Sequence, residues 1–220
     1  MLWVGQFGIV DGEAWEHVPW IGSFVDPHPS DDSADLYVVV EPALPGSQEF
    51  SGELTDAIGG VFHQGRGSVT GALLRALQAA HTNLHEWNRH SLKEHRVAAG
   101  VSCLAVRSLE AYLAQVAPAS AVHYHQGSGS PLMLNPTIPD AVEPLGLHDE
   151  FWPHFSRLEL IEGDRLLLLS PALAGLIPRQ DLVSALDLPP NEALPALYRQ
   201  ARSLDNCGAL LVAVLPEPAV

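Results

Sequence analysis

The feature that most constrains the fold is a long amphipathic pattern between residues 68 and 87. Apolar side chains recur there at spacings of three and four residues, in the series Val69, Leu73, Leu77, Ala80, Leu84 and Trp87. This period gathers them on one face of an α-helix, and such a face is normally buried against another element. Residues 52–62 show a shorter series of the same kind. Two consecutive helices are therefore expected in the first half of the chain.

Short apolar runs around these helices predict β-strands. Residues 36–40 are β-branched, aromatic or aliphatic and are followed by Pro42, which is typical of a short buried strand. Residues 101–106 and 209–215 have the same character. Residues 158–161 and 166–169 flank a turn-rich segment, Glu162-Gly163-Asp164-Arg165, which predicts a β-hairpin. Residues 108–115 are compatible with either a helix or a strand, because helix-favouring residues lie beside turn signals.

Three further helices are expected in the second half, one ending near residue 178, one over 180–186 and one over 191–203. Helices in two groups, with strands before, between and after them, predict an α+β layered fold rather than a parallel doubly wound one. The chain has 220 residues, enough to bury about 70 % of its unfolded surface in one core. We therefore expect a single domain over residues 1–220, which includes an irregular strand or hairpin region at 1–34.

The charge balance excludes several classes of partner. Lys and Arg number 11 against 26 for Asp and Glu, a formal net charge of −15. Such a field repels nucleic acid and anionic lipid, so neither nucleic acid nor membrane is expected as a partner. The longest apolar stretch, residues 207–215, is less than half of the ~20 residues that a membrane span requires. Cys103 and Cys207 lie in apolar runs and are expected as reduced core thiols, and the protein is expected in the cytoplasm.

Several short segments follow one another in a characteristic order. They are Asp35-Leu36-Tyr37-Val38-Val39-Val40, Gly100-Val101-Ser102, Ala121-Val122-His123-Tyr124, Pro144-Leu145-Gly146, Glu162-Gly163-Asp164-Arg165 with the leucines after it, and Asp205-Asn206. This order resembles the metal-dependent Ser/Thr protein phosphatases of the PPM type, also called type 2C, over most of residues 35–215. The resemblance implies a four-layer α-β-β-α sandwich, with two antiparallel sheets flanked by helices.

The resemblance also implies a metal site that this sequence has largely lost. Members of the family hold two Mg²⁺ or Mn²⁺ ions with several aspartates and a glycine carbonyl, and a metal-bridging water attacks phosphorus. Where the family has Asp-Gly-x-Gly-Gly, this chain has Glu41-Pro42-Ala43-Leu44-Pro45. Glutamate is one methylene longer than aspartate, and proline fixes φ where the family has flexible glycine.

Two more family motifs are altered. The family's Gly-Asp-Ser-Arg corresponds to Ala117-Pro118-Ala119-Ser120, and its Ser-Asp-Gly-Leu corresponds to Ser170-Pro171-Ala172-Leu173. The family's phosphate-binding arginine has no counterpart in the N-terminal part. Asp56-Ala57-Ile58-Gly59-Gly60 imitates the metal motif, but it does not follow a strand and is interpreted as part of the first helix.

Glu41 and Asp205 therefore remain as vestigial family positions, and one Glu with one Asp cannot hold two divalent ions. The resemblance implies a pseudophosphatase with no catalytic residues and no cofactor, which acts by binding a protein partner or a copy of itself. The alternative is a divergent Mg²⁺- or Mn²⁺-dependent phosphatase whose ligands come from acidic loops. Its candidate ligands are Asp26, Asp31, Asp32, Asp140, Asp149 and Glu150.

Two pairs of histidines leave a third possibility, a transition-metal site. His81 and His85 stand four residues apart in the predicted helix, and His123 and His125 alternate in a strand-like segment. Each spacing places two imidazoles on one face. Solvated or hydrogen-bonded histidines on a polar face are the competing interpretation for both pairs.

Overall fold

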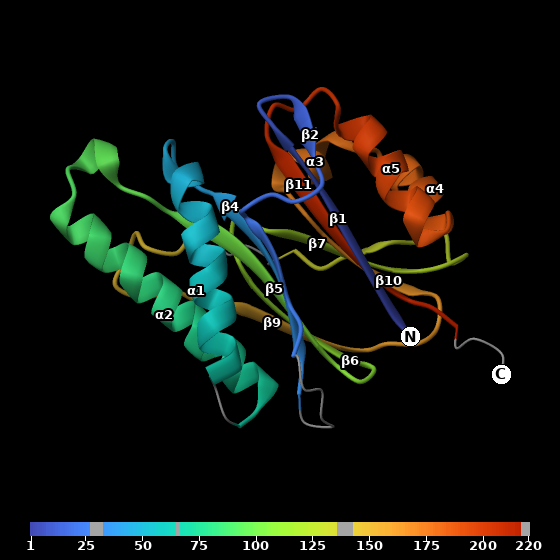
Figure 1. Ribbon diagram of the computed structural model, residues 1–220, viewed down its shortest axis with the longest axis horizontal. Helices are drawn as coiled ribbons and strands as arrows, with labels where there is room; N and C mark the ends of the chain where they lie inside the picture. Colours follow the sequence, from blue (N-terminus) through green and yellow to red (C-terminus); the bar gives the residue numbers. More distant parts are fainter. Residues whose placement is uncertain (27–32, 65–66, 136–142, 217–220) are drawn as a thin grey trace. The chain divides into compact units, whose positions relative to one another are not determined.

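The computed structural model describes residues 1–26, 33–64, 67–135 and 143–216 (Figure 1). Its contacts divide the chain into two compact units. Unit 1 comprises Met1–Val18, Ser120–Asn135 and Leu160–Val220, and unit 2 comprises Pro19–Ala119 and Pro136–Glu159. In the described part of the chain, no helix has the length and apolar character needed to cross a membrane.

Unit 1 is built on a six-stranded antiparallel sheet in the order β2-β1-β11-β10-β7-β8. The strands are β1 (Leu2–Val10), β2 (Glu13–Trp15), β7 (Ser120–His125), β8 (Leu132–Met133), β10 (Asp164–Leu169) and β11 (Cys207–Val214). β10 and β11 are buried along their whole length. Strands buried on both faces are nearly all apolar, and the two runs are therefore readable from the sequence.

Three helices belong to unit 1, namely α3 (Pro171–Leu176), α4 (Arg179–Asp187) and α5 (Pro190–Ala201). They cover one face of the sheet (Figure 1). Leu173, Leu186 and Leu197 of these helices join Val122 and Leu211 of the strands in one hydrophobic core. Burial of such side chains contributes about 1.5–3 kcal/mol each, which makes this core the main source of stability in the unit.

Unit 2 is built on a five-stranded antiparallel sheet in the order β3-β4-β5-β6-β9. The strands are β3 (Ile21–Phe24), β4 (Asp35–Pro42), β5 (Ala99–Arg107), β6 (Glu110–Val116) and β9 (His154–Glu159). β4 and β5 are central and almost fully buried, whereas exposed and half-buried residues alternate along the edge strand β9.

The helices of unit 2 are α1 (Ser51–Gln64) and α2 (Val69–His90), with short 3₁₀ turns η1 (Ser47–Phe50) and η2 (Lys93–His95). α1 packs on β3 and β4, and α2 packs on β5 and β6 (Figure 1). Ser68 begins α2 as its N-cap, because its hydroxyl accepts the Gly71 N–H at 3.1 Å. Both helices therefore lie where the apolar periodicity predicts them.

The imitation metal motif at Asp56–Gly60 is helical, as predicted. It lies inside α1, where a Cβ at Gly59 would be 2.4 Å from the ring of Phe24. The glycine therefore leaves room for the Phe24 ring, which a larger residue would displace. Residues 108–115, which the sequence left open, are mostly in strand β6.

The predicted hairpin at 158–169 is wrong. A turn does form, with Gly163 at φ 89° and the Asp164 N–H donating to the Ile161 carbonyl at 3.0 Å. The flanking strands, however, do not pair with each other: β9 pairs with β6, whereas β10 pairs with β7 and β11. The turn residues specify the bend only. The fully buried β10, whose last four residues are leucines, suits the centre of one sheet, and the half-polar β9 suits an edge, so the two strands join different sheets.

The prediction of two antiparallel sheets flanked by helices is confirmed.

Candidate functional site

Glu41, the first vestigial position, lies near the end of β4 in unit 2, opposite Gly100 of β5. A Cβ at Gly100 would be only 1.8 Å from the Pro118 carbonyl oxygen, so the backbone is tightly packed beside this position. Oε1 of Glu41 is inaccessible to solvent and has no hydrogen-bond partner among the residues that the structure describes. Burial raises the pKa of Glu41 to about 8. A carboxyl group in such surroundings needs either a proton or a cation to be stable.

The segment after Glu41 is anchored to the start of β5. The Ala43 N–H donates to the Ala98 carbonyl at 2.8 Å, and the Ala98 N–H donates to the Ser47 hydroxyl at 3.0 Å. These bonds and the two prolines fix the backbone at the position where the family has glycines.

Asp205, the second vestigial position, belongs to unit 1 and is exposed just before β11. Its carbonyl accepts the Gly12 N–H at 2.9 Å, and the neighbouring Asn206 side chain accepts the Asp11 N–H at 3.3 Å. Asp11 has a positive φ of 51°. In this unit, residues 205 and 206 therefore hold the tight turn between β1 and β2.

The segment that corresponds to the family's Ser-Asp-Gly-Leu motif is the beginning of a helix. Ser170 is the N-cap of α3, and its hydroxyl accepts the Leu173 N–H at 3.4 Å. Pro171 occupies the first turn, where the absence of a backbone N–H costs nothing. The residues at this position thus provide capping instead of a carboxylate.

The residues at these positions do not fit the two divalent ions that the fold family implies. Within residues 1–26, 33–64, 67–135 and 143–216, no three His, Cys, Asp or Glu side chains are grouped so that they could hold a metal. Mg²⁺ and Mn²⁺ require several oxygen ligands, and Glu41 supplies the only carboxylate identified at its position. We derive no catalytic step through such ions.

The acidic loops of the alternative hypothesis are only partly described. Asp31, Asp32 and Asp140 lie outside the described residues. Asp26 lies after β3, and its backbone N–H donates to Asp35 Oδ1 at 3.3 Å. Asp149 and Glu150 are exposed, and Asp149 Oδ1 is 3.4 Å from His85 Nε2.

The His81 and His85 rings of α2 are stacked nearly parallel, with centroids 5.9 Å apart and planes at 8°. His81 also stacks on Phe151, and its Nδ1 accepts the Gly146 N–H at 3.3 Å. Burial lowers the pKa of His81. The two rings therefore have different partners. Through its contacts with Phe151 and the Gly146 N–H, His81 attaches the segment 146–151 to α2.

His123 and His125 of β7 both contact Asp164 of β10. His125 Nδ1 and His123 Nε2 lie 2.9 Å and 3.2 Å from the same oxygen, Oδ1, although the His123 contact lacks hydrogen-bond alignment. The other oxygen accepts the Ile161 N–H at 2.8 Å. The two histidines therefore lie on one face of β7, as the strand pattern predicts. The residue that both contact is Asp164, whose carboxylate also bonds within the turn before β10.

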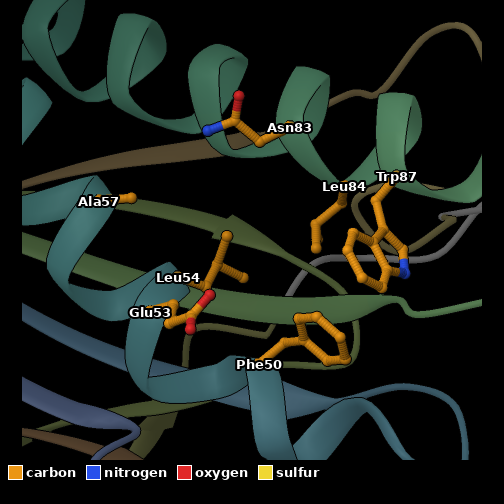
Figure 2. A pocket seen from close by; sticks show the side chains of 7 residues that line it. All are labelled: Phe50, Glu53, Leu54, Ala57, Asn83, Leu84 and Trp87. Carbon is orange, nitrogen blue, oxygen red and sulfur yellow. The ribbon is translucent and has the colours of Figure 1, made fainter.

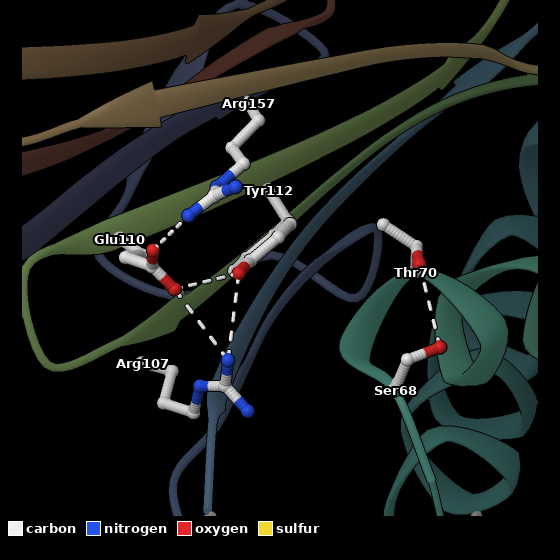
Figure 3. Close-up of polar contacts among 6 residues, drawn as sticks. All are labelled: Ser68, Thr70, Arg107, Glu110, Tyr112 and Arg157. Atoms are coloured by element: carbon white, nitrogen blue, oxygen red, sulfur yellow. Dashed lines mark hydrogen bonds and ion pairs between the residues drawn. The ribbon is translucent and has the colours of Figure 1, made fainter.

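A polar cluster covers the exposed end of the β5–β6 hairpin and β9 (Figure 3). Glu110 accepts hydrogen bonds from the Tyr112 hydroxyl at 2.6 Å, from Arg157 and from Arg107. The Tyr112 hydrogen bond, followed by Arg157, lowers the pKa of Glu110 to about 2. Both guanidinium groups also lie near the Tyr112 ring. Both oxygens of the single carboxylate are therefore engaged within the cluster, which contains two guanidinium groups. Figure 3 also shows the Ser68–Thr70 hydroxyl contact at the start of α2.

A pocket of about 280 Å³ lies between α1 and α2 of unit 2 (Figure 2). It is lined by Phe50, Glu53, Leu54, Ala57, Asn83, Leu84 and Trp87. The Phe50 and Trp87 rings form one end, with centroids 5.2 Å apart and planes at 59°. Sequence reasoning missed this pocket, because the periodicity assigned Trp87 to the buried face. Trp87 is in fact 51 % exposed. Its position near the end of α2 is the one sequence feature that could have suggested this exposure.

Among the comparisons with known proteins, the one with solved structures identifies a fold. No protein-family model matches the sequence, and no curated protein is similar to it. Among solved structures, the Ser/Thr phosphatase Stp1 from Staphylococcus aureus superposes with a TM-score of 0.80 at 14 % identity, covering 99 % of this chain and 96 % of that one. The PPM Ser-Thr phosphatase MsPP from Mycobacterium smegmatis has a TM-score of 0.72 at 16 % identity, with 98 % of each chain covered.

A third solved structure is PppA, described as a key regulatory component of T6SS in Pseudomonas aeruginosa. Its TM-score is 0.73 at 16 % identity, and the match covers 96 % of this chain and 97 % of that one. Identities this low establish the fold and nothing finer. Together with the two flanked antiparallel sheets, these matches show that the chain has the fold of the PPM-type Ser/Thr phosphatases.

Proposed function

We propose that this protein is a degenerate member of the PPM phosphatases that has no phosphatase activity and acts by binding a protein partner or a copy of itself. The observation that carries the proposal is the set of residues at the family's ligand positions. Pro118 and Pro171 stand where the family has aspartates, and within the described residues no three His, Cys, Asp or Glu side chains are arranged so that they could hold a metal ion. Without several carboxylates, neither the attacking water nor the phosphate can be held by divalent ions.

The surroundings of the remaining positions support the same proposal. The segment after Glu41 is fixed by prolines and by bonds to Ala98, so no flexible glycine offers a carbonyl there. Asp205 is exposed and its backbone holds a turn of unit 1. The solved protein PppA, described as a regulatory component, provides a precedent for regulation on this fold.

One observation favours the alternative, a divergent metal-dependent phosphatase. The unpartnered Oε1 of Glu41 would be stabilised by a cation as well as by a proton. Calorimetric titration with Mn²⁺ and Mg²⁺ separates the two possibilities, because a protonated Glu41 gives no binding heat at millimolar metal. Saturable metal binding that Glu41→Gln abolishes would favour the alternative.

The proposal is tested by assaying the purified full chain with p-nitrophenyl phosphate and with a phosphothreonine peptide in Mn²⁺. We expect hydrolysis no faster than in buffer, and no difference between the wild type and Asp205→Ala. Turnover that requires Mn²⁺ and disappears in Asp205→Ala would overturn the proposal. Asp181→Ala is the matched control, because Asp181 is an exposed aspartate on α4 of the same unit.

A further inference from the structure

The pocket between α1 and α2 has the size and the lining of a site for one side chain. Its volume of about 280 Å³ is just below the ~300–1,000 Å³ that small-molecule sites occupy. Leu54, Ala57 and Leu84 make its walls apolar, and the rings of Phe50 and Trp87 form one end (Figure 2). A half-exposed tryptophan beside a pocket is the kind of residue that dominates binding energy in protein interfaces.

Two polar side chains of the pocket are left without partners. Glu53 is the only charged residue in its lining, and neither Glu53 nor Asn83 makes a hydrogen bond or ion pair with any residue that the structure describes. Glu53 offers two carboxylate oxygens as acceptors, and the Asn83 amide offers one more acceptor and two N–H donors. The pocket therefore presents acceptors and aromatic faces that nothing in the described chain uses.

A guanidinium group satisfies these features together. It is planar, pairs with a carboxylate through two parallel hydrogen bonds and stacks on aromatic rings, and it is more weakly hydrated than an ammonium group. An anion would be repelled by Glu53, and a neutral side chain would leave that carboxylate unpaired. The stem of an arginine would lie against Leu54 and Leu84, since apolar stems pack well along apolar walls.

The charges of α1 and of the turn before it also favour a basic occupant, whereas Glu86 and Arg89 of α2 form an ion pair with each other at 3.7 Å. α1 contains Glu53 and Asp56 and no Lys or Arg, and Glu49 is exposed in the preceding turn. The whole chain carries a formal charge of −15. Such a field accelerates the encounter with a basic partner and discriminates against acidic ones.

We propose that the pocket lined by Phe50, Glu53, Asn83 and Trp87 binds an arginine side chain of a protein partner. This inference rests on the proposed function, that the chain acts by binding. It adds the place on the molecule, the chemistry of the recognised residue and the residues that would select it.

The test uses the full chain labelled with ¹⁵N and two peptides of nearly the same shape, acetyl-Leu-Arg-Leu-amide and its citrulline analogue, in which a neutral urea group replaces the charged guanidinium group. We expect the arginine peptide to shift the indole N–H resonance of Trp87, which is assigned by its disappearance in Trp87→Phe. The citrulline peptide should bind at least about tenfold more weakly, because a hydrogen bond to a charged group is stronger than a neutral one.

Variants then test the role of the carboxylate. Glu53→Gln should abolish the preference for arginine over citrulline, whereas Asp56→Asn, an exposed acid of α1 outside the pocket, should preserve it. Equal binding of both peptides to the wild type, or a preference that survives Glu53→Gln, would overturn the inference in favour of a neutral apolar occupant. Absence of any Trp87 shift at millimolar peptide would overturn it outright.

Two further outcomes are distinguishable. Dimerisation in sedimentation velocity that Glu53→Gln abolishes would identify a second copy of the chain as the occupant, and would overturn the assignment to another protein. Failure of the peptide experiment leaves the phosphatase assay unchanged, so the pocket can be wrong while the proposed function stands. Mn²⁺-dependent turnover, in contrast, would overturn the proposed function whatever the peptides do.

Discussion

Two groups of polar side chains, one on the helix side of each unit, differ in whether they bond to other residues of the chain. On the helix side of unit 1, Asp187 at the end of α4 accepts the Tyr124 hydroxyl at 2.6 Å and the Gly127 N–H at 2.9 Å, and Arg165 donates to the Leu188 carbonyl. On the helix side of unit 2, Glu53 and Asn83 have no such bonds among the described residues. Polar groups that are bonded internally stabilise the fold, whereas unpaired ones beside an apolar pocket remain available to a partner.

The largest expected effect is on the free energy of unfolding. We expect a cavity in the closed core of unit 1 to lower it more than a cavity beside the pocket of unit 2 does. Leu197→Ala removes a fully buried side chain of α5, and it should lower the free energy of unfolding by about 3 kcal/mol. Leu84→Ala, at the edge of the α1–α2 pocket, should cost about 1–2 kcal/mol, because its cavity adjoins existing space. Urea unfolding measures both, and a larger loss for Leu84→Ala would contradict the comparison.

The next effect concerns Glu41, a carboxyl of unit 2 that lacks the bonds Asp187 has. Its pKa of about 8 in the folded chain lies above the ordinary value of 4.5. The stabilising effect of protonation is complete below pH 4.5 and is lost as the pH rises to 8. Glu41→Gln should remove this loss, so that the variant exceeds the wild type by on the order of 2 kcal/mol at pH 8.

Urea unfolding between pH 5 and pH 9 measures this difference directly. The exposed Glu49→Gln provides the control and should follow the wild type at every pH. Parallel curves for Glu41→Gln and the wild type would show that Glu41 is ionised in the folded chain.

A smaller effect is expected at Asp187 itself. The Tyr124 hydroxyl, and after it the Gly127 N–H, lower the pKa of Asp187. The stability that this carboxylate contributes is present at neutral pH and is lost as the pH falls through its lowered pKa. Asp187→Asn should therefore cost about 1 kcal/mol at pH 7 and nothing in strong acid. In a double-mutant cycle, the variant with both Asp187→Asn and Tyr124→Phe should lose less free energy of unfolding than the two single variants lose together. Losses that simply add would show that the hydrogen bond between these side chains contributes nothing.

Much of the fold could be predicted, because the signals were local. The helical period of residues 69–87 and the uniformly apolar strands at 36–40 and 209–215 specify their own secondary structure. Strand β6 was ambiguous because Leu109, Glu110 and Ala111 favour a helix. Between β5 and β9 six of its seven residues are buried, and such packing overrides intrinsic propensity. The pairing of β9 with β6 depends on residues 39 to 49 positions apart, from Gln115 with His154 to Glu110 with Glu159, which no local turn signal can specify.

The candidate site was less predictable for the same reason. Motif comparison identified Glu41 and Asp205, but only the structure shows that Oε1 of Glu41 lacks a partner in the described part of the chain and that residues 205–206 hold a turn. The pocket arises where Phe50 of η1 meets Trp87 near the end of α2, two residues that no sequence period relates. A helical period indicates which face is apolar, but it does not indicate whether the last turn still lies over the sheet.

The smallest expected effect most directly sharpens the contrast between the two helix layers. Glu53→Gln and Asn83→Ala should each change the free energy of unfolding by less than about 0.5 kcal/mol, because neither side chain bonds to another described residue. Thermal unfolding of the unliganded chain measures this at neutral pH. A loss comparable to that of Asp187→Asn would mean that these side chains already serve the fold, and the α1–α2 pocket would then have no unused acceptor to offer. Stability that is unchanged, combined with altered peptide preference in Glu53→Gln, would separate a binding role from a structural one, which is the distinction on which the comparison depends.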